Sequence, residues 1–344
     1  MYNTIDIRNN NTEIFSIDNG NTGGNYKKES SLGYTLQHLD SISVSQLDTI
    51  RIKVTNSCPF SCNFCHHEGS LKNRNLIIDE HLLRGLNRFY KEMKLTQVHL
   101  TGGEPTLYYY CLDLIRELKS IGFKVKMTTN GQFNQNFLEQ LNDAGLDGIN
   151  FSIHTLDPIR LCKIQKMNKD YNWGLSALNM QINNLKTANK SGLEVKVNTV
   201  VQNDSDIFDV LSIKDFCKGV GINFRMLNNL DQGLASIQMI ERVIGAMGAT
   251  MESINLSDKS SGCSINYVCR DRFRFKVKYI RKNTINTLCD GCKTIDVCRE
   301  WFYGIRIEQV DKGASVRLCI HRQDYPAVQT FEDFFASRQF QELV

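Results

Sequence analysis

The stretch RIKVTNSCPFSCNFC, residues 51–65, decides the fold of this chain. Its opening residues RIKVT alternate between charged and apolar side chains, and this pattern predicts a short strand. Three cysteines follow directly in a C-x3-C-x2-C spacing, at Cys58, Cys62 and Cys65. Because closely spaced thiolates select zinc or an iron–sulfur cluster, this loop predicts a metal site. Three protein ligands would leave one position of that site open to a small molecule.

Strands and helices alternate after this loop. Apolar runs predict further strands at TQVHL (96–100), FKVKMTT (123–129), GINFSIHT (148–155), LEVKVNTVV (193–201) and INFRML (222–227). Helical spacing predicts helices over 79–93, 108–121, 137–144, 173–190, 207–218 and 232–254. Asp79 is a suitable N-cap, and Gly122 is a suitable end for the second helix. Repeated βα units predict an α/β fold, a partial (βα)6 barrel of TIM type, with its chemistry at the C-terminal ends of the strands.

Composition shifts predict three regions. Residues 1–47 are rich in Asn, Ser, Gly and Thr, and they predict a polar N-terminal arm or cap. The barrel is expected over residues 48–255. After Cys263 the βα alternation stops, so residues 256–344 are expected to form a small C-terminal region of short strands that carries several cysteines.

Composition also excludes several classes of protein. The chain has 344 residues, 12 of them cysteine, and a formal net charge of +4, too mild to argue for nucleic acid or a membrane surface. No apolar run is long enough to span a membrane, and the first residues lack the features of a secretory signal. A cytoplasmic protein is therefore expected. Its thiols would stay reduced and serve as core residues, catalytic groups or metal ligands.

The cysteine loop after a first barrel strand resembles the radical S-adenosylmethionine (SAM) superfamily. The resemblance implies that the three cysteines hold a [4Fe–4S] cluster whose open iron is chelated by SAM. It also implies that a 5′-deoxyadenosyl radical abstracts a hydrogen from the substrate. Phe64, just before the third cysteine, matches the aromatic position of the family motif. On the cysteines alone, a zinc site completed by His66 or His67 stays open, although zinc sites usually contain paired C-x2-C units.

Polar motifs at the ends of the following strands fit the same family. A glycine pair lets a backbone approach a ligand closely, and a glutamate can accept a hydrogen bond from an ammonium group. The resemblance assigns the LTGGEP motif to the methionine moiety of SAM, and TTNG and two later strand ends to further contacts with SAM. The residues so implied are Gly102, Gly103, Glu104, Pro105, Thr129, Asn130, Ser152 and Asn198. For the later positions, a strand-end cap or turn is the alternative.

A second group of cysteines lies near the C-terminus. Cys289, Cys292 and Cys298 have a C-x2-C-x5-C spacing, and Cys319 follows. This pattern resembles the auxiliary-cluster half of SPASM and Twitch extensions, and it implies a second [4Fe–4S] cluster closed by four thiolates. Zinc is the alternative. Phe302 stands where the full SPASM pattern has a further cysteine, so we expect one auxiliary cluster only.

The other cysteines are expected to bind no metal. Cys263 and Cys269 begin a motif whose later members are absent, so they are expected to be unligated. Cys111, Cys162 and Cys217 stand alone in apolar surroundings, which favours a place in the core.

Over residues 51–230 the chain is similar to the molybdenum-cofactor GTP cyclase family. By position, Arg51, Lys196, Arg225 and Arg306 match basic residues that hold the nucleotide triphosphate there. Surface ion pairing is the alternative for these four side chains. The chain departs from that family at Gly304, which replaces an arginine, at its fourth C-terminal cysteine, and at its ending QELV, which replaces a glycine pair. GTP cyclisation is therefore not assigned, and a small, anionic, nucleotide-like or metabolite-like substrate is expected.

Two other functions remain open from the sequence. A SPASM-type enzyme that matures peptides is one, although residues 1–47 are short and polar for a peptide-recognition module. A non-catalytic iron–sulfur or zinc scaffold is the other, and the intact cysteine loop followed by GGEP argues against it. The family resemblance also implies an electron donor of the flavodoxin or ferredoxin type.

Overall fold

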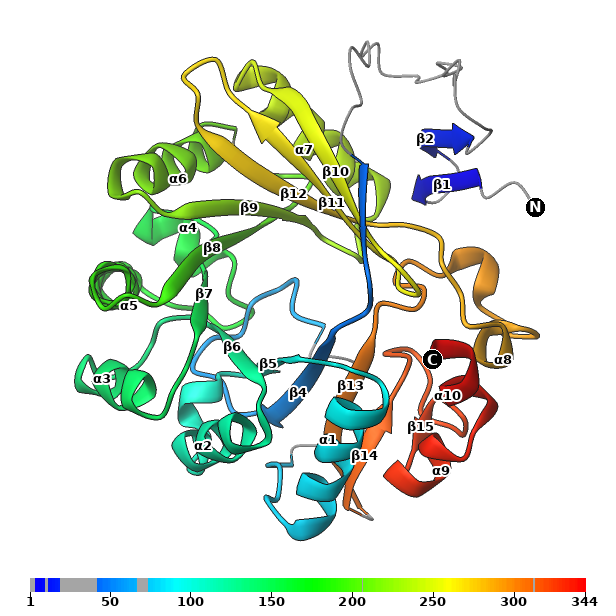
Figure 1. Cartoon of the computed structure of the whole chain (residues 1–344). Helices are drawn as coiled ribbons and strands as arrows, with labels where there is room; N and C mark the ends of the chain where they lie inside the picture. The colour runs from blue at the N-terminus through cyan, green and yellow to red at the C-terminus, as the bar shows by residue number, and fades with distance from the viewer. Residues whose placement is uncertain (1–3, 10–11, 19–41, 67–73, 206, 312) are drawn as a thin grey trace. The chain divides into compact units, whose positions relative to one another are not determined.

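The computed structural model describes residues 4–9, 12–18, 42–66, 74–205, 207–311 and 313–344 (Figure 1). The predicted polar segment 19–41 and His67 lie outside these residues. The chain divides into two compact units. We call Leu47–Thr199, Phe208–Arg225 and Gly304–Val344 the barrel unit. The other, the auxiliary unit, comprises Met1–Gln46, Val200–Ile207 and Met226–Tyr303.

The barrel unit contains the six strands expected from the sequence. They are neighbours in chain order: β4 (Thr49–Thr55), β5 (Gln97–Gly102), β6 (Lys124–Thr129), β7 (Gly148–Ser152), β8 (Glu194–Val201) and β9 (Asn223–Asn228). The pairings from β4 through β8 are parallel, as repeated βα units require. The last residues of β8 and β9 pass into the auxiliary unit. The predicted barrel strands are therefore confirmed.

Helices cover the outer side of these strands in Figure 1. They are α1 (Glu80–Glu92), α2 (Cys111–Ile121), α3 (Asn136–Asp143), α4 (Pro158–Lys163), α5 (Tyr171–Lys190) and α6 (Ile207–Val220). The predicted N-cap of α1 and the predicted end of α2 are confirmed. The Asp79 side chain caps α1 by accepting from the Leu82 amide at 2.8 Å. Gly122 ends α2 in the left-handed region, at φ 111°, where glycine carries no steric cost.

The two faces of the parallel sheet differ in polarity. On the face toward the helices the strands bury Ile50, Ile52, Val98, Leu100, Val125, Met127, Ile149, Phe151, Val195 and Val197. The alternate residues, on the inner face, are Arg51, Lys53, His99, Thr101, Lys126, Thr128, Asn150, Ser152, Lys196 and Asn198. The inside of a TIM barrel is ordinarily packed with branched apolar side chains. A polar inner face instead suits a ligand-binding interior.

The C-terminal segment joins the barrel unit. Strand β13 (Ile305–Val310) pairs in parallel with β4, and β14 (Gly313–Arg317) and β15 (Val328–Gln329) extend the sheet. Helices α9 (Phe331–Phe335) and α10 (Arg338–Leu343) follow, and Phe89 of α1 packs its ring against Phe334 and Phe335. The predicted single region 256–344 is therefore divided, since residues 304–344 belong with the barrel. Pairing between β13 and β4 joins segments about 250 residues apart, so no local pattern reveals it.

The auxiliary unit is built on an antiparallel meander. Strands β10 (Thr250–Ser257), β11 (Gly262–Val268) and β12 (Arg274–Ile280) pair in order, and β3 (Ile42–Ser45) adds to β10 in parallel. The unit also contains α7 (Leu234–Ala246), α8 (Asn286–Cys289), a 3₁₀ turn η3 (Ile295–Val297), and a hairpin of β1 (Thr4–Asn9) and β2 (Thr12–Asp18). The expected N-terminal arm thus contains strands.

One predicted helix was wrong in its second half. The helix expected over 232–254 ends at Ala246, and Thr250 begins a strand. Gly248 lies between them at φ +56°, a conformation that stops a helix at little cost only for glycine. Among the described helices, none combines the length and the apolar character that crossing a membrane requires.

Candidate active site

The first cysteine loop lies in the barrel unit, between β4 and α1. Cys58 and Cys65 are exposed and Cys62 is half-buried. The loop is held against the segment that follows α4: the Asn63 amide donates to the Ile164 carbonyl at 2.8 Å, and the Lys166 amide donates to the Ser61 carbonyl at 2.7 Å. These main-chain bonds hold the loop at the end of the strand even without side-chain contacts.

Two side-chain amides point at the cysteine sulfurs. Asn130 Nδ2 lies 3.4 Å from Cys58 Sγ, and Gln165 Nε2 lies 3.8 Å from Cys62 Sγ. Gln165 also accepts from the Ser61 amide at 2.7 Å, which fixes its orientation. N–H groups directed at sulfur stabilise a thiolate and tune a cluster bound to it. Gln165 was missed from the sequence, because it lies 103 residues from the cysteine that it contacts.

The chemistry of the loop fits an iron–sulfur cluster. Burial, together with the nearby Cys65 and Cys58 thiols, raises the pKa of the Cys62 thiol to about 12. The three sulfurs are thus close enough to interact, and a cluster would compensate their mutual repulsion as thiolates. Among the described residues, no three His, Cys, Asp or Glu side chains converge on a site for a single metal ion. The side-chain geometry by itself therefore favours neither zinc nor an iron–sulfur cluster.

The GGEP motif packs directly on the strand that leads into this loop. A Cβ on Gly103 would lie 2.3 Å from the Ser57 carbonyl oxygen, and one on Gly102 would lie 2.3 Å from that of Thr55. The Gly103 amide donates to the Thr55 carbonyl at 2.7 Å, and the Glu104 amide donates to that of Ser57 at 2.8 Å. Only glycines allow this approach. The motif predicted to bind SAM therefore also braces the cysteine loop.

Glu104 connects two strand ends from a fully buried position. Its Oε1 accepts from the Thr129 hydroxyl at 2.7 Å and the Thr106 hydroxyl at 2.8 Å, and its Oε2 accepts from the Asn130 amide at 2.6 Å. Burial raises the pKa of this carboxyl, and the hydrogen bonds to Asn130, Thr129 and Thr106 oppose the rise. Pro105 follows and begins a short 3₁₀ turn, η2 (Pro105–Leu107). The carboxylate holds the TTNG turn beside GGEP, and its contact with an ammonium group stays a prediction.

The remaining predicted SAM contacts lie on neighbouring strand ends. Ser152 of β7 is in register with Asn198 of β8. Gln181 of α5 donates to the carbonyls of Ser152 and Asn130, both at 2.8 Å. Asn184 donates to the carbonyl of Gly131 at 2.9 Å. These two helix residues hold the strand ends in place. They were missed from the sequence, although polar residues on the buried face of a helix were a signal.

A histidine lies beside the cysteine motif. The His154 ring meets Phe64 edge-on, with centroids 4.7 Å apart. Burial lowers the pKa of His154 to about 4, so the imidazole is neutral at pH 7. Phe64 and Phe60 also pack against the small core formed by Leu161, Ile164, Ala177 and Leu178. The family-type aromatic residue is therefore part of the packing that supports the loop.

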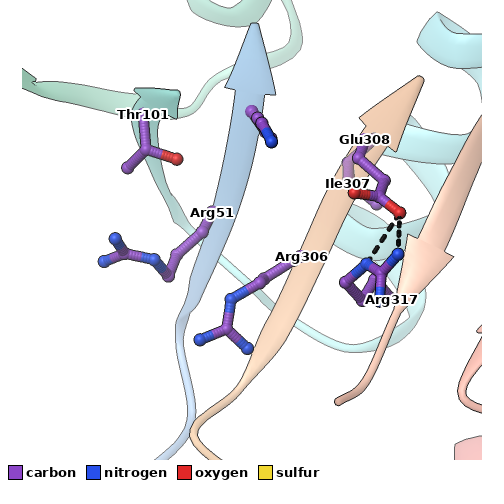
Figure 2. A pocket seen from close by; sticks show the side chains of 7 residues that line it. Arg51, Thr101, Arg306, Ile307, Glu308 and Arg317 are labelled. Carbon is purple, nitrogen blue, oxygen red and sulfur yellow. Dashed lines mark hydrogen bonds and ion pairs between the residues drawn. The ribbon is translucent and has the colours of Figure 1, made fainter. Parts of the chain in front are cut away.

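The four predicted substrate residues divide into two groups. Arg51 of β4 and Arg306 of β13 are in direct register, and both line one narrow pocket (Figure 2). Lys53, Thr101, Ile307, Glu308 and Arg317 complete its lining. Lys196 instead lies 3.5 Å from the Glu194 carboxylate, and Arg225 donates to Asn198 Oδ1 at 2.9 Å. The structure brings together Arg51 and Arg306, and it gives Lys196 and Arg225 protein contacts outside this pocket.

The second cysteine group forms a series of tight turns in the auxiliary unit. The Cys292 amide donates to the Cys289 carbonyl at 3.0 Å, and the Trp301 amide lies 3.3 Å from Cys298 Sγ. All three cysteines are half-buried, and so is Cys319. Cys319 follows β14 and belongs to the barrel unit. The four-cysteine ligand set stays a prediction. Phe302, at the position of the absent further cysteine, is buried.

The remaining cysteines are mostly in the core. Cys111 and Cys217 are buried, as expected, and Cys162 is only half-buried. Cys162 lies on the last turn of α4, where its Sγ lies 3.0 Å from the Asp170 carbonyl oxygen. Cys263 and Cys269 are buried in the auxiliary unit. Burial raises the pKa of Cys263 to about 12, and Arg281 and Lys278 oppose the rise. That these two bind no metal stays a prediction.

Comparison with known proteins identifies the family. The profile of the Radical SAM superfamily matches residues 52–217. A relative from Sulfolobus acidocaldarius, named as a probable GTP 3′,8-cyclase, is 30% identical over 296 residues, 81% of this chain and 83% of its own length. The chain belongs to the radical SAM superfamily.

Other radical SAM proteins are similar over most of the chain. The GTP 3′,8-cyclase of Aquifex aeolicus is 26% identical over 300 residues, 83% of this chain and 89% of its own length. The crystal structure of Streptococcus suis SuiB bound to S-adenosylmethionine shares the fold, with a TM-score of 0.54 and 19% identity. That match covers 84% of this chain and 64% of SuiB.

Family membership establishes the chemistry that the site serves. The chain is a radical SAM enzyme that uses a [4Fe–4S] cluster and SAM. That Cys58, Cys62 and Cys65 hold this cluster stays a prediction, and the glycine pair beside them packs against the backbone of Thr55 and Ser57. The C-terminal cysteine motif fits a second cluster.

Proposed function

We propose that this radical SAM enzyme abstracts a hydrogen atom from a small, phosphorylated, nucleotide-like substrate held inside the barrel unit. The observation that carries the proposal is the register of Arg51 with Arg306 on neighbouring parallel strands, in one pocket on the inner face of the sheet. Guanidinium groups bind phosphate oxygens through paired, charge-assisted hydrogen bonds. When bound, the cluster supplies the electron that cleaves SAM.

The residues of the chain itself supply binding, orientation and exclusion of water. Lys53 and Arg306 are 5% and 4% exposed, so the cationic side chains lie largely out of solvent. Several cationic side chains gathered on one inner face support an anionic ligand at this position. Glu104, Gln181 and Asn130 hold the strand ends between which SAM is predicted to lie.

The names of the relatives make GTP the first substrate to test. Two relatives that match along most of their length are named GTP 3′,8-cyclases. The inner-face cations support a nucleotide substrate, whereas Gly304 leaves the product open. Peptide maturation is the second candidate. SuiB supports only the fold, because its identity to this chain is 19%.

Isotope transfer tests the proposal. The anaerobically reconstituted and reduced protein would be supplied with SAM and with GTP deuterated on the ribose, and 5′-deoxyadenosine would be analysed by mass spectrometry. Deuterium in 5′-deoxyadenosine supports a nucleotide substrate. Formation of 5′-deoxyadenosine that carries no label from GTP or from any other phosphorylated candidate, but does carry label from a deuterated peptide, would overturn the proposal in favour of peptide maturation.

A further inference from the structure

The pocket of Arg51 and Arg306 also contains one carboxylate. Glu308 lies on β13 two residues after Arg306 and is 2% exposed. Its Oε1 accepts from Arg317 Nε at 2.6 Å (Figure 2). Its Oε2 is buried and has no hydrogen-bond partner among the residues that the structure describes. A buried carboxylate oxygen without a donor is costly, so this atom indicates a donor supplied by something other than the described residues.

Arg317 holds Glu308 in place but has no further capacity to satisfy it. Besides its bond to Glu308, its Nη1 donates to the carbonyls of Arg322 at 2.8 Å and Cys319 at 3.1 Å. Its Nη2 donates to Gln323 Oε1 at 2.6 Å. Arg317 is 1% exposed, and these bonds fix its guanidinium. One oxygen of Glu308 is therefore anchored, and the other is buried among the residues that line the pocket.

The charges around Glu308 Oε2 limit the kinds of ligand that the pocket can bind. Four cationic side chains line the pocket against the single carboxylate. A metal cation is disfavoured in such surroundings, and an anion is favoured. A purely anionic group, however, would be repelled by Glu308 and would leave its Oε2 unsatisfied. The pocket therefore suits an anion that carries a hydrogen-bond donor next to it.

We propose that Glu308 is a specificity-determining residue, which accepts a hydrogen bond from a hydroxyl or ammonium group adjacent to the phosphate of the substrate. The inference rests on the proposed function, since it takes the phosphate to lie against Arg51, Lys53 and Arg306. It adds that the enzyme selects among phosphorylated molecules by the group beside the phosphate.

Binding of small phosphate esters tests the inference on the full chain with its clusters loaded. Ethyl phosphate carries no donor beside its phosphate, phosphoethanolamine carries an ammonium group, and glycerol 3-phosphate carries hydroxyls. Dissociation constants would be measured anaerobically by calorimetry at one ionic strength. We expect one or both donor-bearing esters to bind about tenfold more tightly than ethyl phosphate, as one hydrogen bond to a charged acceptor provides. The better ester identifies the donor.

Glu308→Gln removes the acceptor with little change in shape. The amide oxygen would stay with Arg317, so the NH2 group would face the pocket and could no longer accept. The preference for the donor-bearing ester should then fall below about threefold, while ethyl phosphate still binds. Glu80→Gln is the matched control, because Glu80 is an exposed glutamate that also pairs with an arginine, Arg84. It should keep the full preference.

The outcomes separate this inference from the proposed function. If no phosphate ester and no GTP binds, both are overturned. If ethyl phosphate binds as tightly as the other esters to the unmodified protein, only the role of Glu308 is overturned, and this comparison stands even if the variant fails to fold. Retention of the full preference in a folded Glu308→Gln variant would also overturn it.

Discussion

The two cysteine segments of this enzyme are held in different ways. The loop of Cys58, Cys62 and Cys65 is braced from outside, by GGEP on one side and by the segment around Gln165 on the other. The segment from Cys289 to Cys298 is organised mainly by turns within itself. All three predicted ligands of the first site come from one loop, whereas Cys319, the predicted fourth ligand of the second, lies beyond that segment and after β14.

This difference indicates what fixes the geometry of each cysteine site. Bracing by several strand ends fixes the first loop before any cofactor binds, which suits a site that must position SAM. Local turns bring cysteines near one another but leave their final geometry to the metal, as in sites whose folding is coupled to metal binding. Each of the following predictions tests one side of this contrast.

Loss of the first site should have the largest effect. The triple variant Cys58→Ala, Cys62→Ala, Cys65→Ala should form no detectable 5′-deoxyadenosine, because all three thiolates predicted to hold the first cluster are removed. Iron analysis should show the loss of one cluster only. Cys217→Ala, a buried thiol on α6, is the control and should keep both the iron and the activity. Activity in the triple variant would remove the loop from the catalytic site.

Loss of the second site should be selective. Cys298→Ala should lower the iron and sulfide content by about half, since one of two predicted clusters is lost, and should leave SAM cleavage by the first cluster in place. Circular dichroism checks that the variant has folded. A zinc content of one ion per chain in the unmodified protein, with iron for one cluster only, would contradict the second cluster and support the zinc alternative.

The arginine pair connects the two segments in the sequence. Arg51 lies on β4, before the loop of Cys58, and Arg306 lies on β13, after Cys298. Arg51→Ala and Arg306→Ala should each weaken GTP binding about 10- to 100-fold, as the loss of a charge-assisted phosphate contact does. The double variant should lose less than the sum of the two effects, because both side chains would bind one anion. Arg116→Ala, on the exposed surface, should change nothing.

The smallest effect is expected from Gln165, a positioning residue. Gln165→Leu removes the N–H group near Cys62 and the acceptor for the Ser61 amide. Fewer N–H groups toward cluster sulfur lower the reduction potential, so the midpoint potential of the first cluster should become more negative and SAM cleavage a few-fold slower. Gln135→Leu, an exposed glutamine that bonds Thr187, is the control. An unchanged potential with a disordered cluster signal would mean that Gln165 acts only on loop structure.

Much of the site followed from local sequence because its motifs are local. The C-x3-C-x2-C loop, GGEP and TTNG each lie at the end of one strand, and parallel strands place those ends at one edge. The supporting residues could not be predicted in this way. Gln165 and Gln181 act across 103 and 51 residues respectively, through contacts that depend on how α4 and α5 pack on the sheet.

The C-terminal region also depends on long-range contacts that local sequence patterns do not predict. The end of the βα alternation predicted a separate region over 256–344, yet β13 pairs with β4 and places Arg306 beside Arg51. The helix expected over 232–254 gave way to a strand after Gly248, since an apolar run with mixed spacing does not distinguish a buried helix from a strand.

The sequence by itself determined the family and the order of βα units, and it predicted the cysteine ligands of the first cluster, because periodicity and motif spacing are carried by neighbouring residues. Only the tertiary structure decided that Arg51, Arg306 and Glu308 share one pocket, and that one carboxylate oxygen there has no donor among the described residues. The physical reason is that strand pairing and burial depend on contacts between residues far apart in the sequence. These contacts set the free-energy cost of burying each charged group, so no single segment of sequence reveals that cost.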